Sequence, residues 1–363
     1  MRRFLLLLRN EFALFRTAIP AHAVAALQPA VLYLLMTTIL VHPTFDMNMA
    51  RPETVLGAEL AAALEQVGSP VGEPYVRLAM VDWDGGTVDR QVIRVEALDG
   101  GSLARPVAVQ HFGLIDSNLV KNFRNRLTTA ALRLWDAELG PRSVTVEQHP
   151  WLPHDVPYNV YFGMAVLPMA TFLAAAIIGA MLTAQEFEFR TVVEYRLAPA
   201  TLGLILGGRL VRLALTALLS AGVVWLAVGL VTGVWPRDPW LVVLILLPVA
   251  VVAGCVGMTA ALLLRRTIPA FLVGLVGAFA GWIVGGAFGL PSSFGATFER
   301  VSRLTPFAHA IELLFPRYFG DRSSASAVTI GSPVISALVL LLMAAGMVAL
   351  TAMVYQRRVR RQE

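Results

Sequence analysis

The stretch YFGMAVLPMATFLAAAIIGAMLTA at residues 161–184 is followed directly by QEFEFRTVVEYRLAP at residues 185–199, and this junction decides the fold. The first part holds no charged residue and is long enough to cross a hydrocarbon core as a helix, which takes about 20 residues. The second part carries Glu186, Glu188, Arg190, Glu194 and Arg196. Because charged side chains are costly inside a bilayer, we expect the chain to leave the membrane at this junction.

The rest of the chain has the same apolar character. Hydrophobic residues make up 57% of its 363 residues and charged residues 15%, a balance outside the range of soluble globular domains. Six stretches are long enough to span a membrane, at residues 21–42, 161–184, 210–231, 241–264, 268–290 and 333–355. The predicted fold is a polytopic α-helical membrane protein with six transmembrane helices and an α/β domain inserted between the first and second.

Arginine residues set the expected orientation. They cluster before the first span, after the last span, and in the loops on that same side. The positive-inside rule makes this side cytoplasmic, with both termini there. The loop arginines are Arg190, Arg196, Arg209, Arg212, Arg265 and Arg266. Residues 1–20 hold apolar positions at spacings of three and four, which predicts an amphipathic interfacial helix.

Residues 43–157 are too polar for a membrane and too long for a simple loop, so we expect a folded α/β domain outside the cytoplasm. Its predicted elements are helices near residues 56–67 and 117–134 and strands near 76–80, 106–112 and 143–147. Within these 115 or so residues Asp and Glu outnumber Lys and Arg. The basic charge therefore belongs to the cytoplasmic rim, which predicts contact with anionic lipid or a protein partner and no nucleic acid.

Small residues recur every four positions in the fifth span, at Gly277, Gly281, Gly285 and Gly289. Such a face lets another helix approach closely. Packing within one bundle, a homodimer seam and a conduit wall remain open as interpretations. Residues 291–331 then predict short outer helices broken at Pro306 and Pro316, each too short to cross.

The chemistry of nucleotide hydrolysis is missing from the sequence. A P-loop needs a Gly-Lys pair, whereas the one lysine of the chain, Lys121, lies between Val120 and Asn122. No HExxH or GxSxG motif occurs either. His149 and His154 lack a cluster of further ligands, so we expect no metal site.

His309 and Glu312 lie three residues apart on a predicted outer helix. They allow either a proton-sensitive pair or a structural hydrogen bond.

The coupling segment, residues 184–199, predicts a helix on which Glu186, Arg190 and Glu194 form one charged ridge. A solvated face and a partner-binding face are both compatible with this spacing. A helix that runs along the inner surface and ends at Pro199 is placed to transmit force to the spans on either side.

The chain resembles the permease subunit of type-2 ABC transporters, in the exporter group with a large external domain between spans one and two. The family pattern after its second span is matched by Glu186, Glu188, Thr191, Glu194, Leu197 and Pro199. Gly207 and Arg209 match the opening of its third span, residues 304–310 its outer segment, and residues 79–84 the start of its external domain. Arg190 stands where the family has glycine, which predicts a more continuous helix here.

This resemblance implies a homodimer, or a heterodimer with a related permease, bound to two ABC ATPase subunits in the bacterial cytoplasmic (inner) membrane. The permease itself would need no cofactor, because ATP and Mg²⁺ are bound by the ATPase. The residues it implies for ATPase coupling are Glu186, Glu188, Arg190, Thr191, Glu194 and Arg196.

Three function classes follow from these observations. The first is the permease of an ATP-driven exporter for an amphipathic or hydrophobic substrate, since the predicted spans show no internal charge. The second is a non-transporting membrane scaffold or sensor whose outer domain binds a ligand. The third, an intramembrane enzyme, needs buried polar residues that converge on one site, and the sequence offers almost none.

Overall fold

The computed structural model describes most of the chain, which forms two compact units. One unit comprises residues 1–41 and 156–363, and the other residues 42–155. The described residues are 9, 19–40, 45–68, 75–83, 92–97, 106–111, 125–134, 158–191, 201–288, 291, 296–319 and 333–360.

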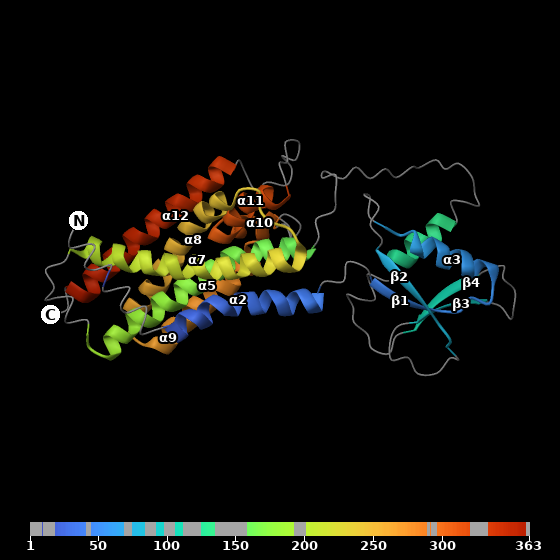
Figure 1. Ribbon diagram of the computed structural model, residues 1–363, viewed down its shortest axis with the longest axis horizontal. Coiled ribbons are helices and arrows are strands. Elements are labelled where there is room, and N and C mark those ends of the chain that lie inside the picture. The colour runs from blue at the N-terminus through green and yellow to red at the C-terminus, as the bar shows by residue number, and fades with distance from the viewer. Residues whose placement is uncertain are drawn as a thin grey trace. The chain divides into compact units, whose positions relative to one another are not determined.

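The first unit is a bundle of long helices (Figure 1). Six of them are long and apolar enough to cross a membrane, which confirms the predicted number of spans. They are α2 (Ile19–Leu40), α5 (Tyr158–Glu188), α7 (Leu202–Thr232), α8 (Pro239–Leu264), α9 (Thr267–Val284) and α12 (Pro333–Tyr355). Two shorter helices, α10 (Ala296–Ser302) and α11 (Pro306–Phe319), precede α12, and a π-helical turn, η2 (Gln356–Arg360), follows it.

Helix α5 is the centre of this bundle. In its most apolar stretch 89% of the residues are buried, against 22% for α9 and for α12. Small residues allow the close packing, because a Cβ atom placed on Gly257 of α8 would lie 2.1 Å from the carbonyl oxygen of Ala176. Gly179 of α5 meets Gly254 of α8 in the same seam. The backbones of α5 and α8 are therefore in direct contact.

The second unit contains a four-stranded sheet in the order β2-β1-β3-β4. Its strands are β1 (Phe45–Ala50), β2 (Val76–Val81), β3 (Val92–Ala97) and β4 (Pro106–His111). Strand β1 pairs in parallel with β2 and β3, while β3 and β4 are antiparallel. Helix α3 (Val55–Glu65) connects β1 to β2 and buries Leu60 and Leu64 against the sheet.

The predicted strands near residues 76–80 and 106–112 are β2 and β4, and the predicted helix near 56–67 is α3. Strands β1 and β3 were not predicted from the sequence. Residues 125–134 are helical, as expected for the end of the helix predicted at 117–134. The predicted strand at 143–147, like His149 and His154, lies outside the described residues.

Three helix boundaries in the bundle differ from the predictions. Helix α7 begins at Leu202, so that Arg209 and Arg212 lie inside this helix instead of in a loop. Helix α9 ends at Val284, short of the predicted residue 290. Helix α11 continues through Pro316, which was expected to break it. The interfacial helix predicted at residues 1–20 falls almost entirely outside the described residues.

The coupling segment also differs from a single helix over residues 184–199. Helix α5 runs on to Glu188, so residues 184–188 are the end of a span, and a turn follows at residues 189–191. Arg190 therefore does not continue the ridge that begins at Glu186. Residues 192–199, with Glu194 and Arg196, lie outside the described part of the chain.

Candidate functional site

The candidate site is the α5 terminus, residues 186–191, where the charges of the coupling segment begin. Its first contact is an ion pair. Arg209 of α7 donates from Nη2 to Oε1 of Glu186 at 2.5 Å. The Arg209 side chain is 5% exposed and that of Glu186 18% exposed, so both charges are largely removed from solvent. A buried pair of this kind fixes the position of α5 against α7, because neither charge can lose its partner cheaply.

The next residue along the chain contacts another helix. The guanidinium of Arg265, the residue after α8, lies over the ring of Phe187 at 5.8 Å from its centroid. Arg265 has a φ of 55°, the left-handed conformation common at helix ends. This conformation ends α8 and allows α9 to start two residues later.

Glu188 contacts the beginning of α9. Its Oε1 accepts a hydrogen bond from the backbone N–H of Thr267 and its Oε2 accepts one from the Thr267 hydroxyl, both at 2.8 Å. The N-cap residue of α9, Arg266, makes no side-chain cap bond of its own. A carboxylate at this place satisfies a free N–H and also interacts favourably with the positive end of the helix dipole. Glu188 thus caps a helix that begins 79 residues later in the chain.

The turn after Glu188 presents its side chains outward. Phe189 is 72% exposed, and Arg190 is also exposed. Arg190 has a φ of 60°, in the left-handed region that glycine adopts without cost. The prediction that arginine in place of the family glycine makes the helix more continuous is therefore wrong. The backbone keeps the bend that glycine would permit, with arginine in a strained conformation.

Replacing Arg190 with glycine is expected to stabilise the protein by about 1 kcal/mol, because the left-handed conformation costs an L-residue with a Cβ atom roughly that amount. The measurement is the apparent unfolding temperature of the purified protein in detergent. Phe189→Gly is the matched control, since Phe189 does not have a positive φ. It should lower the unfolding temperature. Equal shifts for the two variants would contradict the explanation.

The structure brings together four of the six residues predicted for coupling: Glu186, Glu188, Arg190 and Thr191. The Thr191 hydroxyl donates to the carbonyl oxygen of Glu186 at 3.5 Å, which closes the turn. Sequence reasoning missed the roles of Phe187 and Phe189, and it missed the partner Thr267. An aromatic residue beside each acidic one was the available signal, but their partners lie far away in sequence.

The glycines predicted for helix packing behave differently from one another. A Cβ atom on Gly281 or Gly285 would clash with Phe307 of α11, at 2.6 Å and 2.4 Å from its nearest side-chain atom. Gly277 has no heavy atom within 4 Å of that position, and Gly289 lies outside the described residues. Two of the four therefore pack within the bundle, against Phe307 of α11.

The expectation that the spans hold almost no buried polar groups is also wrong. Arg209 and Arg212 are 4% and 6% exposed inside α7. His22 of α2 lies 3.0 Å from the hydroxyl of Thr216, and Ser220 donates to the carbonyl oxygen of Ala25. The contacts of His22, Thr216 and Ser220 join α2 to α7, whereas Arg209 pairs with Glu186 of α5.

The second unit holds a cleft of about 490 Å³ at the carboxyl ends of β1 and β2. Its lining includes Arg51, Asp82, Trp83 and Arg94. Arg51 pairs with Asp82 at 2.8 Å, and the Arg94 guanidinium lies 6.0 Å from the Trp83 ring centroid. Ligands commonly bind at this edge of parallel strands. Among the described residues of the whole chain, no group of three His, Cys, Asp or Glu side chains is placed to hold a metal ion.

Comparison with known proteins gives one family. A model described as ABC-2 family transporter protein matches residues 108–346, which is more than half of the chain. The match begins in β4 and extends into α12, so it includes the whole α5 terminus and all of its partner helices. No curated protein matches the chain.

Proposed function

Since the chain belongs to the ABC-2 family of transporter proteins, we propose that it is the permease of an ABC exporter driven by a separate ATPase subunit through the α5 terminus. The family makes it a multi-pass membrane protein and a permease subunit of an ABC transporter. Members of this family are in general non-catalytic and work with an ABC ATPase. The outward direction, the coupling route and the substrate are the parts that we add.

One observation carries the coupling route. Three successive residues of α5, Glu186, Phe187 and Glu188, contact three different helices. Their partners are Arg209 in α7, Arg265 after α8, and Thr267 at the start of α9. A displacement of this short stretch would move the ends of all three helices together, since Glu186 and Arg209 form a largely buried ion pair that is expensive to separate and the other two contacts tie the same stretch to the connection between α8 and α9.

The exposed turn supplies the surface that the ATPase would hold. Phe189 and Arg190 are exposed to solvent, whereas residues 186–188 contact the other helices of the bundle. A large exposed aromatic residue beside an arginine is the composition of an interface hot spot. We therefore assign ATPase binding to residues 189–199 and force transmission to residues 186–188. Glu194 and Arg196 belong to the same surface in this proposal.

In the proposed cycle, ATP closes the two ATPase subunits and displaces the α5 termini of two permeases, in a homodimer or with a related chain. The inner ends of the helices move, and a central cavity changes its accessibility and its affinity for the substrate. The membrane would be the bacterial cytoplasmic membrane, with both termini inside. An amphipathic or hydrophobic substrate fits helices that are mostly apolar, since the buried arginines lie near one end of α7.

A pull-down of the full-length protein from gently solubilised native membranes tests the partner. A P-loop subunit is expected to co-purify and to hydrolyse ATP. The double variant Phe189→Ala/Arg190→Glu should lower its recovery at least tenfold, because an interface loses an aromatic anchor and gains a repulsive charge. The unfolding temperature should stay near that of the wild type, since neither side chain packs on the bundle.

Glu59→Lys is the control, because Glu59 is an exposed residue of α3 in the second unit. Its recovery of the ATPase should equal that of the wild type. Undiminished recovery with the double variant would refute the assignment of the binding surface. Reconstituted complexes that move only small hydrophilic solutes would refute the proposed substrate class.

A non-transporting sensor is the second candidate, and the cleft of the α/β unit is the observation that favours it. Arginine, aspartate and tryptophan side chains around the cleft could hold a polar ligand. The ATPase assay on the complex separates the two functions. ATP hydrolysis that increases when substrate is added would support the exporter. If no ATPase co-purifies with the protein, the sensor is supported.

A further inference from the structure

Three buried hydroxyl groups of the bundle lack a hydrogen-bond partner among the described residues. They belong to Tyr33 and Thr37 of α2 and to Tyr318 of α11. Tyr33 is 0% exposed and Tyr318 7% exposed. A buried hydroxyl that bonds nothing costs free energy, because folding removes it from water without replacing the lost hydrogen bonds. Such groups are rare in native proteins, so three of them in one bundle indicate a partner that is not a protein group.

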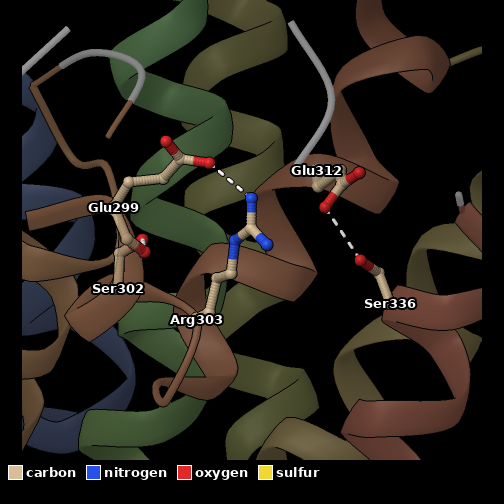
Figure 2. Close-up of polar contacts among 5 residues, drawn as sticks. All are labelled: Glu299, Ser302, Arg303, Glu312 and Ser336. Atoms are coloured by element: carbon tan, nitrogen blue, oxygen red, sulfur yellow. Dashed lines mark hydrogen bonds and ion pairs between the residues drawn. The ribbon is translucent and has the colours of Figure 1, made fainter. Parts of the chain in front are cut away.

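Other buried hydroxyls of the same bundle do have partners. Tyr161 of α5, which is also 7% exposed, donates to the carbonyl oxygen of Gly286 at 2.7 Å. Ser336 of α12 donates to Oε2 of Glu312 at 2.8 Å, and these two side chains face each other in Figure 2. The bundle thus pairs a buried hydroxyl directly where a protein acceptor is within reach.

The three hydroxyls without a partner are neighbours. Tyr33 and Thr37 lie one turn apart on α2, and their oxygens are close, but no hydrogen bond of good geometry joins them. Burial raises the pKa of Tyr318, and the nearby phenol of Tyr33 raises it further. The two phenol groups are therefore near enough to interact electrostatically, although they do not bond each other. Water bridges many pairs of polar groups that are separated in this way.

The two tyrosines cannot satisfy their hydroxyls by a local rearrangement. A threonine side chain can turn toward a carbonyl oxygen of its own helix, but a phenol oxygen lies too far from its own backbone. The Tyr33 ring is packed in place, because a Cβ atom on Gly163 of α5 would lie 2.9 Å from its Cε2 atom. Tyr318 follows Arg317, whose guanidinium bonds Asp238 at 2.9 Å and holds this end of α11.

The chemistry of these groups selects a small, neutral ligand. Hydroxyls carry no full charge with which to bind an ion, and a raised pKa keeps the phenol of Tyr318 neutral. The oxygen atoms are closed to bulk solvent, which excludes a large ligand. Buried water typically makes about three hydrogen bonds to polar groups that are otherwise unsatisfied. Water can both donate and accept, as three neighbouring hydroxyls require.

We propose that the hydroxyls of Tyr33, Thr37 and Tyr318 form a binding site for ordered water, and that this water joins the first span, α2, to α11. Helix α2 packs chiefly against α5 and α7, so the water supplies its polar link to α11. The site stands apart from the α5 terminus and does not depend on the function proposed for it.

Radiolytic hydroxyl-radical labelling of the purified full-length protein in detergent, read by mass spectrometry, tests for the water. X-rays generate radicals from ordered water as well as from bulk water, so a tyrosine beside buried water is labelled although it is not exposed. Tyr33 and Tyr318 should be labelled several-fold faster than Tyr161, the matched control, which is as buried as Tyr318 but bonds a carbonyl oxygen directly. Rates no higher than that of Tyr161, or high only in a maltoside detergent and not in an amine oxide without hydroxyls, would overturn the proposal.

The variants Tyr33→Phe and Tyr318→Phe test the same site by its stability. Each removes one hydroxyl and leaves the ring in place. If the hydroxyls bond water, each variant should lower the unfolding temperature by about 2 °C, because a hydrogen bond is lost. The loss in the double variant should be smaller than the sum of the two, since both hydroxyls bond the same water. A rise in unfolding temperature for both single variants would mean that the hydroxyls are dry and would refute the water site.

Discussion

A Gly257→Val variant is expected to leave almost no folded protein after extraction into detergent. The added Cβ atom would lie 2.1 Å from the carbonyl oxygen of Ala176 and 2.9 Å from the backbone nitrogen of Ala180. These are backbone atoms of α5, the most buried helix of the bundle, so no side-chain rotation can relieve the clash. Overpacking a core costs about 1–3 kcal/mol where side chains can shift. Here two helices would have to separate, and the cost should exceed that range.

The matched control is Gly277→Val. Gly277 also lies inside a membrane-length helix, but no heavy atom is within 4 Å of its Cβ position. The yield of monodisperse protein by size-exclusion chromatography and the apparent unfolding temperature should fall for Gly257→Val and stay near the wild type for Gly277→Val. Similar values for both variants would show that the α5–α8 contact does not hold the bundle together.

These two glycines also show how far the sequence could predict the packing. The spacing of Gly277, Gly281 and Gly285 predicted a face of small residues, and two of them do receive a neighbouring side chain. Gly257 was not selected, although its contact is closer. A repeat of glycine every four residues shows that one face of a helix carries only small side chains. Which face meets another helix depends on the arrangement of all the helices, and this information is not local.

The spans themselves were predictable because hydropathy over about 20 residues is a local property. The start of α7 was misplaced for a physical reason. Arg209 and Arg212 were read as loop residues, since isolated charges are costly in a membrane. Arg209 is tolerated inside the helix because Glu186, 23 residues earlier, neutralises it. A buried charge and its distant partner look like a loop when each is considered alone.

The charges of the sequence were enough to locate the candidate site. They did not predict which other helices its residues contact. The sequence placed Glu186 and Glu188 at the membrane boundary, and in the structure both lie in the last turn of α5. It gave no indication that Glu188 caps a helix starting at Thr267 or that Phe187 contacts Arg265. Both partners come from a connection between α8 and α9 that reaches α5 only in the folded bundle.

Removing Arg209 is expected to destabilise the protein strongly, and removing its partner as well should restore most of the loss. In Arg209→Met the Glu186 carboxylate, 18% exposed, would lose the cation that lies 2.5 Å away. Breaking a buried ion pair from one side costs about 3–5 kcal/mol, and the remaining exposure of Glu186 places this case near the lower end. Arg209→Met/Glu186→Gln removes both members of the ion pair, so its unfolding temperature should lie closer to that of the wild type.

The exposed pair between Arg303 and Glu299 is the control for this double-mutant cycle. The Arg303 side chain is 49% exposed, so Arg303→Met should change stability by less than about 1 kcal/mol. A loss for Arg209→Met no larger than for Arg303→Met would mean that the Glu186 contact does not fasten α5 to α7.

The same double variant separates folding from coupling. Arg209→Met/Glu186→Gln should fold and should still bind the ATPase, because Phe189 and Arg190 are unchanged. It should nevertheless hydrolyse ATP with little transport in proteoliposomes, since α7 would no longer follow the movement of α5. Transport at the wild-type ratio to ATP hydrolysis would show that the force passes only through Phe187 and Glu188, to the connection between α8 and α9.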